Sequence, residues 1–156
     1  MLKTRQIIPP LTARSTAGQT VRAGDFKQKK NLVIAFLHAN CPRCHAFLGE
    51  LAVRAREFAE REAVALVVYS ETPGAALVGE NLPAQVRVAV DMSGRSLGAY
   101  LGEGAFGPSG LERVGVFVAD RYGELYSQRV ARGEDGLPGV PELLEWLAQI
   151  QAGSEE

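Results

Sequence analysis

A buried-strand pattern runs directly into a pair of cysteines. Leu32 to Leu37 are all apolar, which is typical of a strand covered on both faces of a sheet. Cys41 and Cys44 follow, with Pro42 and Arg43 between them, and they are the two cysteines of the chain. Proline suits the first turn of a helix, where the amide that it lacks would be unpaired. This junction predicts a strand-to-helix turn that carries two thiols.

The spacing of the cysteines favours reversible disulfide chemistry. Three residues of helix place two Cα atoms roughly 5 Å apart, inside the window of about 4.4 to 6.8 Å for a disulfide. Cys41 at the helix start would face unpaired amides and the positive end of the helix dipole, which favour a thiolate. We therefore predict that Cys41 is the nucleophile. Cys44 shares an apolar stripe with Leu48 and Leu51, so we predict that it is the less exposed, resolving thiol.

Apolar runs and amphipathic segments alternate along the rest of the chain. Strands are predicted at 63–69, 86–90, 114–119 and 125–130, and helices at 42–61, 75–79, 94–101 and from Pro141 onward. Residues 102–110 read as a glycine-rich loop. This order predicts an α/β fold, a central mixed sheet flanked by helices, in a single domain over residues 1–156. Residues 1–30 should form an N-terminal β-hairpin extension, and residues 152–156 should fray.

Composition excludes several classes of partner. A chain of 156 residues buries enough surface to fold without a disulfide staple, so its cysteines are available for chemistry. Charged residues make up 22% of the chain and the net charge is -1, so we predict neither nucleic-acid nor membrane binding. No secretory signal is evident at the start, and we expect a cytoplasmic protein unless a leader has been removed. Two neighbouring cysteines in a reducing compartment favour a redox pair.

These residues together resemble the thioredoxin-like superfamily. The resemblance is strongest to its redoxin branch, the thiol-disulfide oxidoreductases and the alkyl hydroperoxide reductase or thiol-specific antioxidant (peroxiredoxin-like) proteins. It covers nearly the whole chain and is carried by Pro10, the Gly18 hairpin, Cys41 to Cys44, Val88 to Asp91, and Phe117 to Asp120 with Gly123. It implies a thioredoxin-like fold and an oxidoreductase with a Cys41/Cys44 redox centre. It also implies a protein or small-molecule disulfide substrate and a thiol reductant, with no cofactor and no metal.

The chain departs from thioredoxins around this centre. Asn40 stands where they have Trp, and Ala35 where they have a buried Asp in the preceding strand. Proton transfer to and from Cys44 therefore lacks its familiar base. The remaining candidates are water and three side chains, His45, His38 and Glu50. The position of the thioredoxin cis-proline falls on Val114, which we expect to tune the active site together with Pro42 and Arg43.

Two further functions remain open beside thiol-disulfide exchange. One is a thiol-dependent peroxidase, although the peroxidatic signature Pro-x-x-x-Thr-x-x-Cys is absent: Cys41 is preceded by Ile34 and His38 at those places. The other is a non-catalytic module that binds a metal or a partner, because Cys41, Cys44, His45 and His38 offer soft ligands. His45, however, would project from a different face of the helix.

Two rival motifs are weaker. Cys-x-x-Cys-His also marks c-type haem attachment, but the export signal that such proteins need is absent and an apolar strand precedes the motif. Gly102 to Gly107 fits the dinucleotide fingerprint Gly-x-Gly-x-x-Gly. It precedes Pro108 and a strand, which is the reverse of the order that phosphate binding requires.

Overall fold

The computed structural model describes residues 2–15, 17–38, 41–71, 82–102, 104–107, 110–111, 113–132 and 136–154. The helix predicted at 75–79 lies outside these residues. The strands are β1 (Thr12–Ser15), β2 (Thr20–Arg22), β3 (Asn31–Leu37), β4 (Ala63–Tyr69), β5 (Val86–Val90), β6 (Phe106–Gly107), β7 (Gly110–Leu111), β8 (Val114–Ala119) and β9 (Leu125–Ala131). The helices are the 3-10 helix η1 (Ala23–Phe26), α1 (Pro42–Val53), α2 (Ala55–Glu60), α3 (Arg95–Leu101) and α4 (Val140–Ser154).

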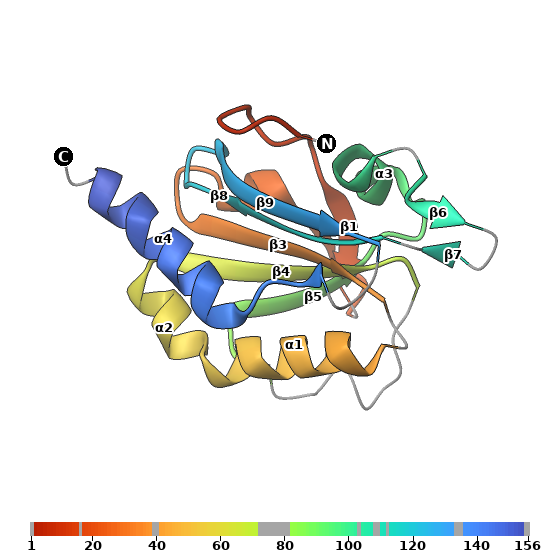
Figure 1. Ribbon diagram of the computed structural model, residues 1–156, viewed down its shortest axis with the longest axis horizontal. Coiled ribbons are helices and arrows are strands. Elements are labelled where there is room, and N and C mark those ends of the chain that lie inside the picture. Colours follow the sequence, from red (N-terminus) through yellow and green to blue (C-terminus); the bar gives the residue numbers. More distant parts are fainter. Residues whose placement is uncertain are drawn as a thin grey trace.

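A seven-stranded mixed sheet forms the centre of the molecule, in the order β2-β1-β5-β4-β3-β8-β9 (Figure 1). β3, β4 and β5 are parallel, and the other pairs are antiparallel. The predicted α/β fold with a central mixed sheet is therefore confirmed. The predicted N-terminal hairpin is also present as β1 and β2. It is more than an appendage, because β1 pairs with β5 and extends the central sheet.

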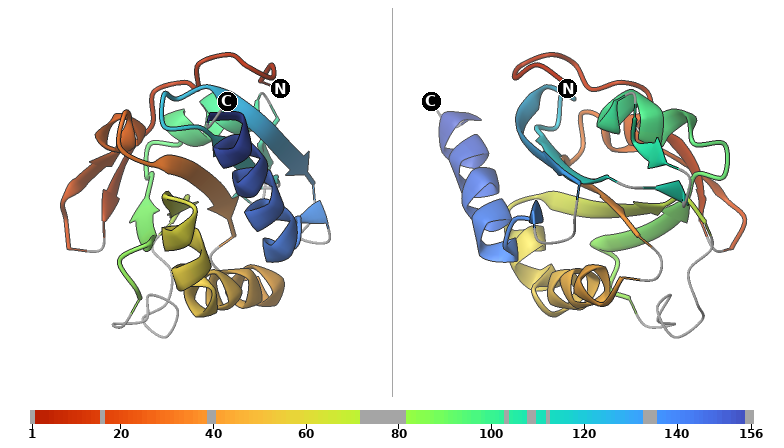
Figure 2. Two further views of the ribbon diagram at one scale, coloured as in Figure 1. Left: turned by 90° about the vertical axis from the view of Figure 1, so that its left-hand side faces the viewer. Right: turned by 45° about the vertical axis from the view of Figure 1, so that its right-hand side comes forward.

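Strand alternation divides the core between the two faces of this sheet. Successive side chains of a strand point to opposite faces, and every residue of β3 and β4 is buried. Val33, Ala35 and Leu37 pack with α1, α2 and α4, whereas the alternate residues of β3 pack with η1 and α3. Figure 2 shows the same division, with α1, α2 and α4 on one side of the sheet and α3 on the other.

Two expectations about the elements need correction or extension. The helix predicted at 42–61 is interrupted at Arg54, whose backbone (φ -100°, ψ 17°) ends α1 and begins α2. The bend lets both helices keep an apolar side toward the sheet. The glycine-rich loop contains a short antiparallel pair, β6 and β7. Helix α4 ends at Ser154, and the fraying of residues 152–156 stays a prediction.

The helices also differ from those that span membranes. None of them, within the described ranges, has both the length and the apolar character required to cross a bilayer.

Candidate functional site

Cys41 caps the first turn of α1. Its backbone is extended (φ -117°, ψ 117°), and its sulfur accepts a hydrogen bond from the amide of Cys44 over 3.0 Å. Its carbonyl accepts a second bond, also 3.0 Å, from the amide of His45. Pro42 occupies the start of the helix. The strand-to-helix junction therefore has the local geometry that its residues predict, with a thiol sulfur in the place usually taken by a Ser or Asp oxygen.

Both cysteines are reduced thiols in a largely enclosed site. Cys44 has no exposed surface and Cys41 exposes 4% of its surface. The order of exposure is the expected one, although the margin is small. Cys44 packs in the same apolar cluster as Leu48 and Leu51, which form the stripe read from the sequence.

Val114, the position matched to the thioredoxin cis-proline, lies in the same apolar cluster as the cysteines. It is the first residue of β8, has no exposed surface and belongs to the cluster that contains Cys41 and Cys44. Among the described peptide bonds none is cis. Arg43 and Pro42 lie on the exposed side of the first turn of α1.

The structure gives the three proton-transfer candidates different settings. His45 is exposed although its neighbour Cys44 is buried, so the two side chains leave α1 on different sides, as expected. Glu50 lies six residues further along α1, roughly 9 Å of helix rise, and its Oε1 is 3.6 Å from Arg54 Nε. The structure therefore turns this carboxylate toward Arg54 and away from the dithiol. His38 follows the end of β3 and is half-buried.

The same side chains do not assemble a metal centre. Within the part of the chain that the structure describes, no three His, Cys, Asp or Glu side chains are grouped so that they could hold a metal ion.

Tyr69 is a residue of this site that the sequence reasoning missed. It ends β4 directly beside Leu37 of β3, has no exposed surface and lies in the cluster that holds both cysteines. Burial raises the pKa of its hydroxyl well above the usual value, and the charges of Cys44 and Cys41 raise it further. The available signal was a tyrosine that ends an apolar strand parallel to the strand leading into Cys41. Parallel strands bring their carboxyl ends to the same edge.

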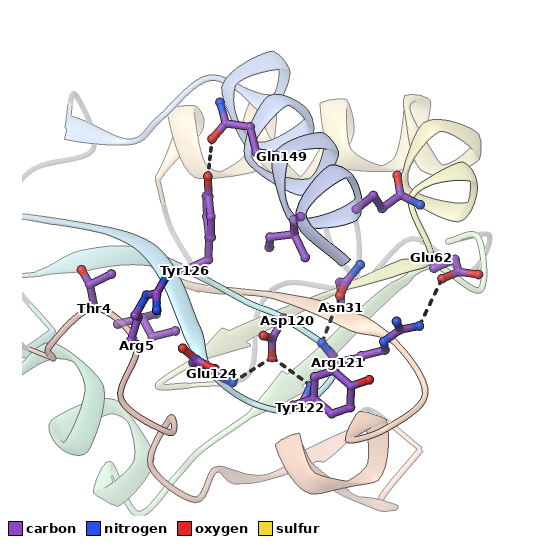
Figure 3. Close-up of a pocket in the computed structure, with 14 residues that line it drawn as sticks. Thr4, Arg5, Asn31, Glu62, Asp120, Arg121, Tyr122, Glu124, Tyr126 and Gln149 are labelled. Atoms are coloured by element: carbon purple, nitrogen blue, oxygen red, sulfur yellow. Dashed lines mark hydrogen bonds and ion pairs between the residues drawn. The ribbon is translucent and has the colours of Figure 1, made fainter. Parts of the chain in front are cut away.

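A cavity of about 420 Å³ lies at the opposite end of β3, near Asn31 (Figure 3). Polar side chains that line it accept hydrogen bonds from backbone amides of the β8–β9 turn. Asp120 accepts hydrogen bonds from the amides of Tyr122 and Glu124, and Asn31 accepts one from the amide of Arg121. The hydroxyl of Tyr126 donates a hydrogen bond to Oε1 of Gln149 across the rim of the cavity. We assign no chemistry to this cavity.

Comparison with known proteins gives both a family and a fold. Residues 4–126 match the AhpC/TSA family. No curated protein matches the sequence significantly. Among solved structures, the mitochondrial 2-Cys peroxiredoxin from Plasmodium falciparum is similar, with a TM-score of 0.78, 16% identity and coverage of 99% of this chain and 97% of that one.

Two other solved structures are also similar. The yeast mitochondrial 1-Cys peroxiredoxin has a TM-score of 0.80 at 16% identity, with 100% of this chain and 79% of that one covered. A putative thiol:disulfide interchange protein DsbE from Chlorobium tepidum has a TM-score of 0.68 at 19% identity, with 94% and 99% covered. These likenesses confirm the thioredoxin-like fold.

Proposed function

The chain belongs to the AhpC/TSA family and is a thiol-based oxidoreductase, and we propose that it exchanges disulfides through the Cys41/Cys44 dithiol. One observation carries the proposal: the amide of Cys44 points at the sulfur of Cys41 from 3.0 Å. A backbone donor at a helix start stabilises negative charge on that sulfur. The second thiol stands one helical turn away, within reach of the first.

The proposed reaction has two steps. The Cys41 thiolate attacks one sulfur of a substrate disulfide, forming a mixed disulfide, and the other substrate sulfur leaves with the electron pair and takes up a proton. Cys44 then loses its proton and attacks the sulfur of Cys41. The bond between Cys41 and the substrate breaks, and the second substrate sulfur leaves as a thiol. The substrate has gained two electrons and two protons, and the protein holds a disulfide.

A thiol reductant must then restore the dithiol. In the yeast mitochondrial 1-Cys peroxiredoxin the thiol is resolved via glutathione and thioredoxin systems, and we propose a reductant of this chemical class for the present chain. The substrate would be a protein or a small-molecule disulfide. We also propose a reducing compartment such as the cytoplasm, where such a reductant keeps thiols reduced.

A thiol-dependent peroxidase is the second candidate. It is favoured by the family and by similar solved structures that are peroxiredoxins, such as those from Plasmodium falciparum and yeast mitochondria. In that reaction the Cys41 thiolate would attack one oxygen of hydrogen peroxide, the O–O bond would break, and the other oxygen would leave with the electron pair and take up a proton to form water. Cys41 would then carry a sulfenic acid, and Cys44 would attack its sulfur, forming the Cys41–Cys44 disulfide and releasing a second water. The same two cysteines serve both reactions, so the distinction lies in the first oxidant.

Stopped-flow mixing of the reduced protein separates the candidates. In one experiment the protein is mixed with hydrogen peroxide. In a second, separate experiment it is mixed with oxidised glutathione or a protein disulfide. We expect oxidation of the dithiol by the disulfide to be the faster reaction, with no disulfide reduction by Cys41→Ser. Faster consumption of peroxide would identify the peroxidase instead. Reaction with neither oxidant would leave a non-catalytic binding module.

A further inference from the structure

The hydroxyl of Tyr69 is exceptional among the buried polar groups. Asn31, Asp91 and Ser96 are the buried polar or charged residues of the described chain, and each has hydrogen-bond partners. Tyr69 Oη is completely buried and has none among the described residues. Buried hydroxyls normally find a partner, and an exception calls for an explanation.

One other buried side-chain atom lacks a hydrogen-bond partner among the described residues, but it lies away from the dithiol cluster. Gln128 Oε1 belongs to an amide whose nitrogen is bonded to the carbonyl of Leu2. Gln128 lies on β9, the strand at one end of the sheet. Tyr69 instead belongs to the cluster that contains the dithiol.

Strand geometry directs Tyr69 toward the cysteines. Ala63, Ala65 and Val67 alternate with residues of the other face and pack with α1, and Tyr69 continues this alternation. Its pairing with Leu37 sets it at the edge where β3 leads into Cys41. The charges of Cys44 and, more weakly, Cys41 raise the pKa of its hydroxyl, in addition to burial. The hydroxyl therefore shares one buried environment with both sulfurs, without a hydrogen bond to either of them in the resting site.

Few other titratable groups face this cluster. Within the described part of the cluster, the titratable side chains are Cys41, Cys44 and Tyr69. On the adjoining elements, the side chains of Arg43 and His45 of α1 and of Glu145 of α4 are exposed, and that of His38 after β3 is half-buried. Two further charged side chains have partners outside the cluster. Glu142 of α4 pairs with Arg129, and Arg113 before β8 donates to the carbonyl of Leu101.

We propose that the Tyr69 hydroxyl donates a hydrogen bond to the sulfur of Cys44 when that sulfur becomes a thiolate to resolve the mixed disulfide. This inference rests on the proposed function. Ala35 stands where the resemblance would place a buried carboxylate, and Tyr69 would stabilise the Cys44 thiolate without acting as its base. Hydrogen bonds of this kind are often long in a resting site and tighten as charge develops.

The role of Tyr69 is that of a donor that keeps its proton. The raised pKa means that the hydroxyl stays protonated at pH values at which an ordinary tyrosine would ionise. In the step itself, Cys44 gives up its proton, its sulfur attacks Cys41, and the bond from Cys41 to the substrate breaks. The substrate sulfur takes the electron pair and a proton, so Tyr69 neither gains nor loses one.

The aromatic disulfide 5,5′-dithiobis(2-nitrobenzoate) tests this step, because each cleavage releases a coloured thiolate. Attack by Cys41 releases the first equivalent, and attack by Cys44 on the resulting mixed disulfide releases the second. The second phase must be independent of reagent concentration and absent from Cys44→Ser. In Tyr69→Phe we expect the first phase to stay within about twofold and the second to slow by about tenfold, the effect of one hydrogen bond to a charged group. The pH profile of the second phase should move about one unit higher.

Tyr100→Phe is the matched control. Tyr100 is equally buried, but it lies on the other face of the sheet and donates to the carbonyl of Pro9. We expect both phases to be unchanged in this variant. An unchanged second phase and pH profile in Tyr69→Phe would overturn the inference and leave the proposed function intact. A single released equivalent from the wild type would overturn the proposed function and the inference with it.

A second measurement leaves Tyr69 unaltered. In Cys41→Ser labelled with ¹³Cζ-tyrosine, the resonance of Tyr69 should shift with pH at the midpoint at which Cys44 ionises, while that of Tyr100 stays fixed over the same range. If the chemical shift of Tyr69 does not change over the pH range in which Cys44 ionises, the inference is overturned.

Discussion

The sulfur of Cys41 accepts the amide of Cys44 at 3.0 Å, so the thiol proposed as nucleophile also caps α1. These two roles use the same electrostatics. An unpaired amide at a helix start needs an acceptor, and a sulfur that carries negative charge needs a donor. The stability of α1 and the reactivity of the dithiol are therefore coupled through one hydrogen bond.

The cap predicts different stabilities for two variants of Cys41. A serine hydroxyl accepts the amide of Cys44 as well as sulfur does, so Cys41→Ser should retain the free energy of unfolding of the reduced wild type. Cys41→Ala removes the acceptor and should lower that free energy by about 1 kcal/mol. Urea unfolding of the reduced proteins at neutral pH checks this, and equal stability of the two variants would show that the cap contributes nothing.

Arg43 should influence the redox poise. It is an exposed residue of the first turn of α1, and its positive charge acts with the helix dipole to favour the reduced form, which makes the disulfide a stronger oxidant. We expect a reduction potential above the roughly -270 mV of thioredoxin. Arg43→Glu should lower it by on the order of 10 to 30 mV. The same charge reversal at Arg56 on α2, whose side chain is 93% exposed, should leave it unchanged.

A glutathione titration measures these potentials. A wild-type potential below that of thioredoxin, or an Arg43→Glu variant indistinguishable from the wild type, would mean that another group sets the poise.

The buried tyrosines predict a loss of stability in alkali. Burial raises the pKa of both Tyr69 and Tyr100 above the usual 10.0. Above pH 10 the unfolded chain therefore releases two protons that the folded chain retains. Stability is complete below this pH and should fall as the pH rises, by about 1.4 kcal/mol per pH unit for each tyrosine.

Urea midpoints measured between pH 8 and 11 test that slope. Tyr69→Phe and Tyr100→Phe should each reduce it, and Tyr122→Phe, at a side chain that is 55% exposed, is the control. A slope that survives both core substitutions would assign alkaline unfolding to other groups.

The sequence patterns were most reliable where burial alone decides the structure. Val86 to Val90 forms a strand with the predicted bounds because its apolar residues fill a closed core. The break at Arg54 was not predictable, since the apolar stripe continues across it from Leu51 to Ala55. That bend depends on how two helices follow a twisted sheet, which is a tertiary effect.

In the candidate site, too, relations that depend on tertiary structure could not be predicted from sequence patterns. Cys41 and Cys44 are neighbours in sequence, so local helix geometry was sufficient to predict their relation. Tyr69 is 25 residues beyond Cys44 in the numbering, and the register of β3 with β4 brings it into the cluster that contains the dithiol. Sequence proximity instead favours candidates such as Glu50, and the structure turns that carboxylate toward Arg54.

The central claim, that Cys41 attacks and Cys44 resolves, is tested most directly by trapping. Each reduced single variant, Cys41→Ser and Cys44→Ser, is mixed with a disulfide substrate, quenched with acid and examined by intact-protein mass spectrometry. Cys44→Ser should accumulate a mixed disulfide on Cys41, because only the second step requires the missing thiol, and Cys41→Ser should remain unmodified. A mixed disulfide in Cys41→Ser and none in Cys44→Ser would contradict the account.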